Sequence, residues 1–124
     1  MANIFSSRFH KGPPPTLQII YRGTVVADLS KKTSSTETVY TFRYLPAFKM
    51  MKLAPLPGLP FSEIPRQSHD LWPFFAERIP DARRPEIKAW MSAKQIDPED
   101  DIRLIAELGS HSITDPFEIQ FAAA

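Results

Sequence analysis

The sequence of 124 residues contains no cysteine, only four glycines and no apolar run as long as the ~18 residues of a membrane-spanning helix. Without cysteine, the chain has no disulfide framework, no thiolate nucleophile and no cysteine-based zinc site. The first residues also lack the basic segment and apolar run of a signal peptide. We therefore expect a cytoplasmic protein that makes no contact with a membrane.

The motifs of common catalytic sites are also missing. The sequence has neither a GxxxxGK[ST] loop nor a GxGxxG loop, so no glycine-rich segment can hold a phosphate. None of the three histidines, His10, His69 and His111, has a second metal ligand three or four residues away. Ser62 and Ser112 lack the flanking glycines of a nucleophile elbow. We expect no catalytic residue, no cofactor and no metal, and hence no enzyme.

The apolar content of 43% and aromatic content of 11% suffice for one hydrophobic core. The net charge of +1 hides an asymmetry, because residues 1–60 carry eight basic and two acidic side chains (+6) and residues 61–124 carry seven and twelve (−5). A basic half can meet nucleic acid or an acidic protein, or can simply keep the domain soluble. No expected helix has a basic face, so we expect DNA contact to be indirect at most. The candidate phosphate contacts are Lys31, Lys32, Lys49 and Lys52.

The first half of the chain is predicted to be mostly strand. Residues 1–15 end in three prolines and are expected to form a flexible arm before a single domain over 16–121, with residues 122–124 as a free tail. Two β-rich runs around Gly23 predict a hairpin. In the third strand, over 39–44, the aromatic residues alternate and are expected to face the core.

Residues 54–65 contain four prolines and cannot form a helix or a central strand. Two interpretations stay open for this segment. It can be a structural connector whose leucines pack inward, or a recognition segment for a proline-binding module.

The second half is predicted to be helical, with about three helices. The first is capped within residues 68–70 and ends near Ile79, the second begins near Pro85, and the third runs from Asp97 to Gly109. Helix capping accounts for the carboxylates of residues 99–101. Residues 117–121 alternate again and predict a strand that returns to the sheet. The fold class is α+β, a small antiparallel sheet packed with these helices.

Trp72 has the most distinctive position of the large aromatic residues. Phe74 and Phe75 define the buried side of the first predicted helix, and the helical phase of Trp72 points away from it, whereas Trp90 belongs to the apolar stripe of its own helix. An aromatic outside the core stripe is either an interface anchor or is covered by a neighbouring loop. The predicted partner-binding residues are Trp72, Pro73, His69 and Asp70.

Three segments in order resemble a known family. They are Leu53-Ala-Pro-Leu-Pro-Gly-Leu-Pro, Leu71-Trp-Pro-Phe-Phe-Ala-Glu-Arg-Ile-Pro-Asp81 and Leu104-Ile-Ala-Glu-Leu-Gly109. With the Tyr21-Arg-Gly-Thr-Val-Val hairpin and the Thr41-Phe-Arg-Tyr44 strand, they resemble the N-terminal subdomain of HipA-type toxin kinases over residues 17–121. The segment after Gly109 departs from the Val-Gly-Ala-Leu strand usual in that family.

The chain ends where a HipA kinase would begin its catalytic domains, so it is similar to the HipS-type antitoxins of tripartite HipBST systems. That resemblance implies an antitoxin that binds a HipA-like kinase, HipT, beside a DNA-binding helix-turn-helix protein, HipB. The alternatives are a structural or activating lobe that completes a split kinase, and a proline-rich adaptor.

Overall fold

The computed structural model describes residues 16–81, 83–112 and 115–122. The predicted arm over 1–15 and the last two residues of the predicted tail lie outside these ranges. Ala122 is described, and its backbone N–H donates to the carbonyl of Thr16 at 2.9 Å.

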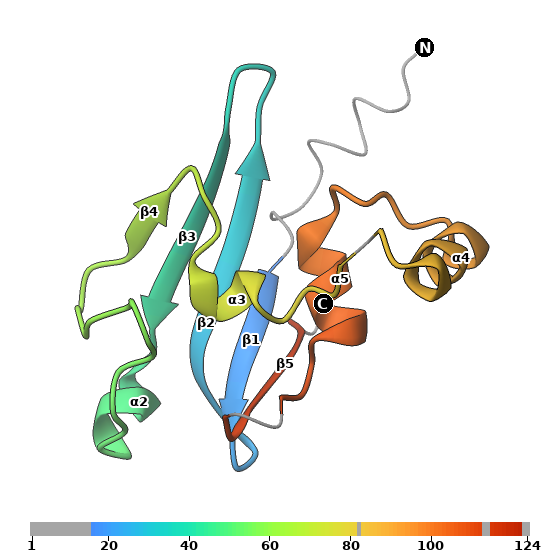
Figure 1. Cartoon of the computed structure of the whole chain (residues 1–124). Helices are drawn as coiled ribbons and strands as arrows, with labels where there is room; N and C mark the ends of the chain where they lie inside the picture. Colours follow the sequence, from blue (N-terminus) through green and yellow to red (C-terminus); the bar gives the residue numbers. More distant parts are fainter. Residues whose placement is uncertain (1–15, 82, 113–114, 123–124) are drawn as a thin grey trace.

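The described residues form one antiparallel sheet of five strands in the order β4-β3-β2-β1-β5 (Figure 1). The strands are β1 (Thr16–Tyr21), β2 (Thr24–Thr33), β3 (Thr38–Tyr44), β4 (Arg66–Ser68) and β5 (Phe117–Phe121). The last strand pairs with the first, so the two ends of the domain meet at one edge of the sheet. This confirms the α+β class, the third strand and the returning strand.

The predicted hairpin is also confirmed, and its turn is tight. Arg22 and Gly23 connect β1 to β2 with φ angles of 48° and 83°. Two successive residues with positive φ form the turn type whose twist matches that of the flanking strands. A register shift between Ile19 and Ile20 adds a bulge just before this turn.

One face of the sheet carries the core. The aromatic residues of β3 point to this face as predicted, since Tyr40 and Phe42 are buried and Tyr44 is partly buried. Facing positions on the neighbouring strands continue the same apolar layer, with Leu17, Ile19, Ala27, Leu29 and Ile119. Strand alternation therefore places every second residue of four strands in a single cluster.

The described residues form four helices, α2 (Pro46–Met50), α3 (Pro73–Ala76), α4 (Pro85–Lys94) and α5 (Asp101–Leu108). α2 begins two residues after the end of the third strand, and its Phe48 is buried. α5 packs on β1 and β5, whereas α4 projects away from the sheet (Figure 1). Met91 of α4 joins Ile96 and Leu104 in a second, smaller cluster, on which Trp90 is packed and partly buried.

The first predicted helix is wrong in length and start. α3 is a single turn that begins at Pro73, and Trp72 is its extended N-cap residue. Of the residues 68–70 expected to cap it, Ser68 pairs instead with Tyr40 of β3 as the last residue of β4. The chain then reaches Pro73 through the extended Trp72. Phe74 and Phe75 are nevertheless buried as predicted, and Leu71 and Ile79 pack against the same core.

The third predicted helix starts three residues later than expected, because its N-cap moves from Asp97 to Asp100. Asp100 is the N-cap of α5 and accepts from the backbone N–H of Arg103 at 3.3 Å. Asp97 closes a separate turn, in which its carboxylate accepts from the N–H of Glu99 at 2.9 Å. The prediction that α5 ends at Gly109 is confirmed.

The proline-rich segment is a packed connector. Leu56 and Leu59 are buried in the core. The Tyr44 hydroxyl donates to the carbonyl of Leu59 and accepts from the N–H of Leu56, the latter at 2.9 Å. The connector interpretation is therefore confirmed, and a proline-binding partner would have to recognise this segment in its packed conformation.

Gly109 is required by close packing. A Cβ at this position would lie 2.6 Å from the backbone oxygen of Arg78 and 2.7 Å from its Cβ. We expect Gly109→Ala to lower the free energy of unfolding by about 1–3 kcal/mol, because backbone has to move. Urea unfolding checks this value, with Ser92→Ala on the exposed side of α4 as a neutral control. Equal stability of Gly109→Ala and wild type would contradict the packing argument.

Candidate partner-binding surface

The four predicted partner-binding residues lie on one segment, between the end of β4 and the start of α3. His69 is exposed, and its Nε2 lies 2.8 Å from the Oε1 of Glu37 near the tip of the β2–β3 hairpin. Asp70 is exposed, and its backbone N–H donates to the Ser68 hydroxyl at 3.0 Å. A single short segment of the chain therefore carries all four residues.

Trp72 differs from the prediction in its environment. As an extended N-cap residue it has no helical phase, so the argument that its phase points away from the core is wrong. Its ring packs edge-on against Phe42, with the two ring centres 6.2 Å apart, and the side chain remains partly exposed. Trp72 is therefore both a packing residue and an accessible aromatic surface. Pro73 beside it is exposed and borders a cleft.

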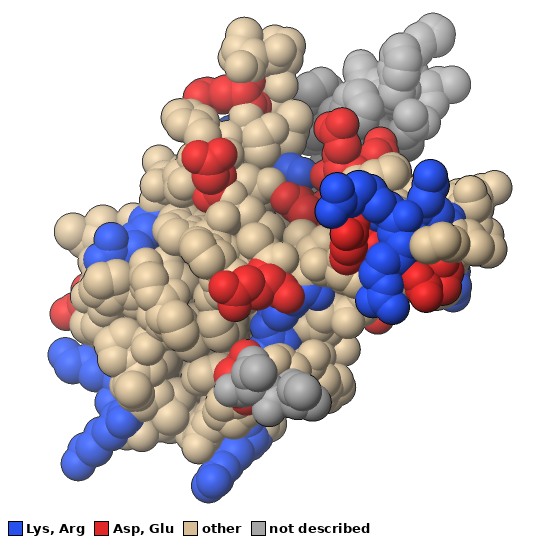
Figure 2. Space-filling model, viewed as in Figure 1, with Lys and Arg blue, Asp and Glu red and all other residues tan. Residues whose placement is uncertain are grey.

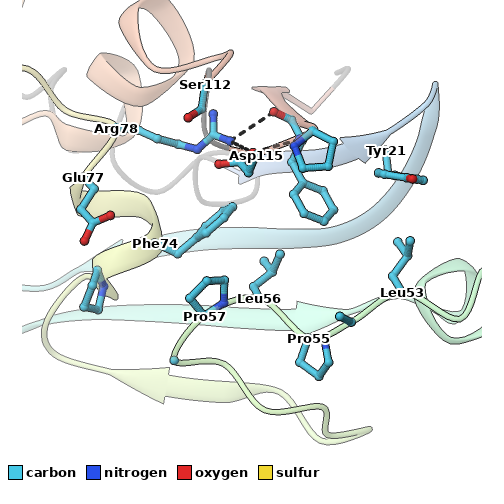
Figure 3. A pocket seen from close by; sticks show the side chains of 15 residues that line it. Tyr21, Leu53, Pro55, Leu56, Pro57, Phe74, Glu77, Arg78, Ser112 and Asp115 are labelled. Atoms are coloured by element: carbon cyan, nitrogen blue, oxygen red, sulfur yellow. Dashed lines mark hydrogen bonds and ion pairs between the residues drawn. The ribbon is translucent and has the colours of Figure 1, made fainter.

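This cleft has a volume of about 960 Å³ and is lined mainly by apolar side chains (Figure 3). One wall is the connector over 53–58, and the other consists of α3, the segment 115–117 and Tyr21. No sequence motif marks this cleft, because its walls come from distant parts of the chain. The aromatic pair of Tyr21 and Phe117, 5.6 Å apart, forms only when β5 returns beside β1.

Arg78 anchors one side of the cleft. Its guanidinium donates to the Gly109 carbonyl at 2.6 Å, to the Asp115 carboxylate at 2.5 Å and to the Phe117 carbonyl at 3.1 Å. The side chain is only 4% exposed and lies 5.2 Å from the ring centre of Phe74. Burial lowers the pKa of Arg78, and the charge of Asp115 opposes that shift. No sequence motif marked this residue.

A second polar cluster joins the sheet to α5. The Asp101 carboxylate accepts from Lys31 Nζ at 2.9 Å and from the Tyr40 hydroxyl, and Lys31 also donates to the Glu99 carbonyl at 3.3 Å. Capping therefore does not account for all the carboxylates of residues 99–101, because Asp101 holds two side chains of the sheet. Lys31, one of the four candidate phosphate contacts, is accordingly occupied within the domain.

The other three candidate lysines, Lys32, Lys49 and Lys52, are exposed and have no carboxylate partner in the described part of the chain. Lys49 Nζ lies 5.9 Å from the ring centre of Phe61. Figure 2 shows basic side chains projecting from the end of the molecule that carries α2 and the β1–β2 turn.

The Tyr40–Asp101 contact predicts a loss of stability at alkaline pH. Burial, and then the hydrogen bond to Asp101, raise the pKa of Tyr40 above the ordinary tyrosine value of about 10. The folded state therefore favours the neutral phenol, and this contribution is present below pH ~10 and is lost as the pH rises through the folded pKa. We expect the free energy of unfolding to fall above pH ~10 more steeply for wild type than for Tyr40→Phe.

Urea unfolding at a series of pH values measures this difference. Tyr44, whose pKa burial also raises, is present in both proteins and so cancels from the comparison. Parallel pH curves for the two proteins would show that Tyr40 does not contribute.

Among residues 16–81, 83–112 and 115–122, no group of three or more histidine or carboxylate side chains is placed to hold a metal ion. No helix in the same part of the chain has the length and apolar character needed to cross a membrane.

Comparison with known proteins identifies the family. The family model of the HipA N-terminal domain matches residues 17–113, which is most of the chain. The chain therefore belongs to the HipA N-terminal domain family, and this family is compatible with a toxin–antitoxin context. Searches of curated proteins and of solved structures gave no significant match.

Proposed function

We propose that this protein is a non-enzymatic, cytoplasmic antitoxin that binds and inhibits a HipA-like serine/threonine kinase of the HipT type. The single observation that carries the proposal is the match of residues 17–113 to the HipA N-terminal domain family. This family is compatible with a toxin–antitoxin context and with a HipA-type kinase as the partner. In a HipBST-type complex, a HipB-like helix-turn-helix protein would bind the DNA, and this chain would contact DNA indirectly at most.

The surface supports a role in protein binding. Among the described residues, large apolar side chains remain in water at Met50 (79% exposed) and Ile64 (75% exposed), and at Phe61. Trp72 adds a partly exposed indole. Aromatic and methionine side chains of this kind are enriched in the centres of protein interfaces.

The second candidate function is an activating lobe that completes a split kinase. The same family match favours it, because a domain that occurs within a kinase can support the folding of its catalytic part when supplied as a separate chain. The two functions predict opposite effects on phosphorylation.

Co-expression with a HipA-like kinase of the HipT type, followed by a phosphorylation assay with the purified proteins, tests both functions. We expect the protein to restore growth of cells that produce the kinase, and to lower phosphate transfer in proportion to complex formation. A rise in phosphate transfer would support the activating lobe. Unchanged growth together with unchanged transfer would contradict both candidates.

Trp72 is predicted to contact the kinase. Truncation of an interface aromatic costs about 2 kcal/mol of binding free energy or more. Because Trp72 also packs on Phe42, we expect Trp72→Ala to lower both the free energy of unfolding and the affinity for the kinase.

Leu71→Ala is a matched control, because Leu71 is partly buried against the same core but was not predicted as an anchor. Calorimetric titration below the melting temperature of both variants separates the two effects. If Trp72→Ala weakens binding no more than Leu71→Ala does, Trp72 acts only in packing.

A further inference from the structure

The cleft beside α3 has the form of an open groove with an apolar middle. In Figure 3, Leu56, Pro57 and Phe74 lie in its centre, while Glu77 and Tyr21 lie toward opposite ends. Proline rings on the connector and aromatic rings on the opposite wall provide rigid surfaces that lose little entropy when a ligand binds.

The charged groups inside the groove are already paired with one another. Arg78 donates to Asp115 and to two backbone carbonyls, and Asp115 also accepts from the N–H of Phe117 at 2.9 Å. A small-molecule site usually offers convergent polar groups that remain available to the ligand. Here the charges available to an occupant lie at the two ends of the groove.

These ends have opposite charge. Glu77 is exposed at the end of α3 and forms no ion pair with the described residues. At the other end, the Arg22 guanidinium lies 5.3 Å from the ring centre of Tyr21, which lines the groove. Lys52 is exposed and directly precedes Leu53, another lining residue. The groove therefore has one acidic end and one basic end.

Both cations occupy backbone positions that disfavour their side chains. Lys52 has a φ of 56° after α2, where its N–H bonds to Lys49 and the N–H of Leu53 bonds to Phe48, the helix-ending motif that usually contains glycine. Arg22 has a φ of 48° in a turn that favours asparagine. Exposed cations are thus retained beside the groove at two positions where any side chain costs backbone strain. Gln95, the other such non-glycine among the described residues, lies at the end of α4.

We propose that this groove binds an extended segment of the partner kinase, with a basic side chain beside Glu77, apolar side chains in the middle and an acidic side chain beside Arg22 and Lys52. The proposal rests on the proposed function and names the surface through which the kinase docks. An extended chain directs successive side chains to alternate sides, so its apolar side chains can fill the middle of the groove while charged side chains on the same strand face the ends.

The strained cations allow a test in which stability and affinity change in opposite directions. Arg22→Asn and Lys52→Gly each remove a charge and relieve strain. We expect each to raise the Tm by roughly 2–4 °C and to weaken binding of the kinase about fivefold. Glu77→Lys reverses the other end and should weaken binding about tenfold. If Arg22 or Lys52 served only the fold, a replacement that raises the Tm would not weaken binding of the kinase.

Matched controls are available for both kinds of change. Gln95→Gly relieves the same backbone strain at a φ of 57° outside the groove, and should raise the Tm without changing affinity. Glu63→Lys makes the same charge change as Glu77→Lys at an exposed residue that does not line the groove. Calorimetric titration of the full chain with the purified kinase, together with thermal unfolding of each variant, provides the measurements.

The outcomes separate this proposal from the proposed function. If the wild-type protein binds the kinase and all three groove variants bind it with unchanged affinity, the kinase does not dock in the groove, and the proposed antitoxin function is unaffected. A wild-type protein that does not bind the kinase would overturn both. If the protein self-associates and the same variants abolish this self-association, the groove binds a second copy of this chain. That result would contradict the proposal that a kinase segment occupies it.

Discussion

The buried guanidinium of Arg78 is the interaction on which the arrangement of the second half depends. It follows the one-turn helix α3 and binds the end of α5 through Gly109 and the start of β5 through Asp115 and Phe117. These partners are far apart in the chain and belong to different layers, so a single planar cation with several donors holds them in register. The absence of a side chain at Gly109 allows this close approach.

The same interaction gives the cleft its character. Because Arg78 and Asp115 neutralise each other within one wall, the middle of the groove is apolar although two ionised groups border it. In the proposed docking mode, charge recognition is thereby confined to Glu77 at one end and to Arg22 and Lys52 at the other. A surface of this kind selects a partner through complementary charges at its ends and apolar contacts between them, which suits a protein segment better than a phosphate-rich ligand.

Sequence reasoning succeeded where one periodicity dominates. Alternation in β1, β3 and β5, together with the turn at Gly23, was enough to predict the sheet and its aromatic core face. It failed where tertiary pairing overrides local preference. Residues 66–68 contain no alternating apolar residues, so the sequence pattern did not predict β4. The pairing of β4 with β3 then places the start of α3 at Pro73. The cleft and the role of Arg78 could not be predicted from the sequence, because the walls of the cleft and the hydrogen-bond acceptors of Arg78 come from distant parts of the chain.

Trp72 shows how this displacement changes the functional argument. In a helix that began at residues 68–70, its ring would have faced away from the core and contributed little to stability. As the extended residue before Pro73, it instead packs edge-on against Phe42 of β3 while part of the indole stays accessible. Its orientation is thus set by the core, so a partner that contacts the exposed part meets a side chain already held in place. Such preorganisation lowers the entropic cost of binding, because few rotamers remain to be lost. Because Trp72 packs on Phe42, it is not a purely external side chain. The same packing holds the ring in one orientation, which makes Trp72 a better candidate for a specific contact with a partner.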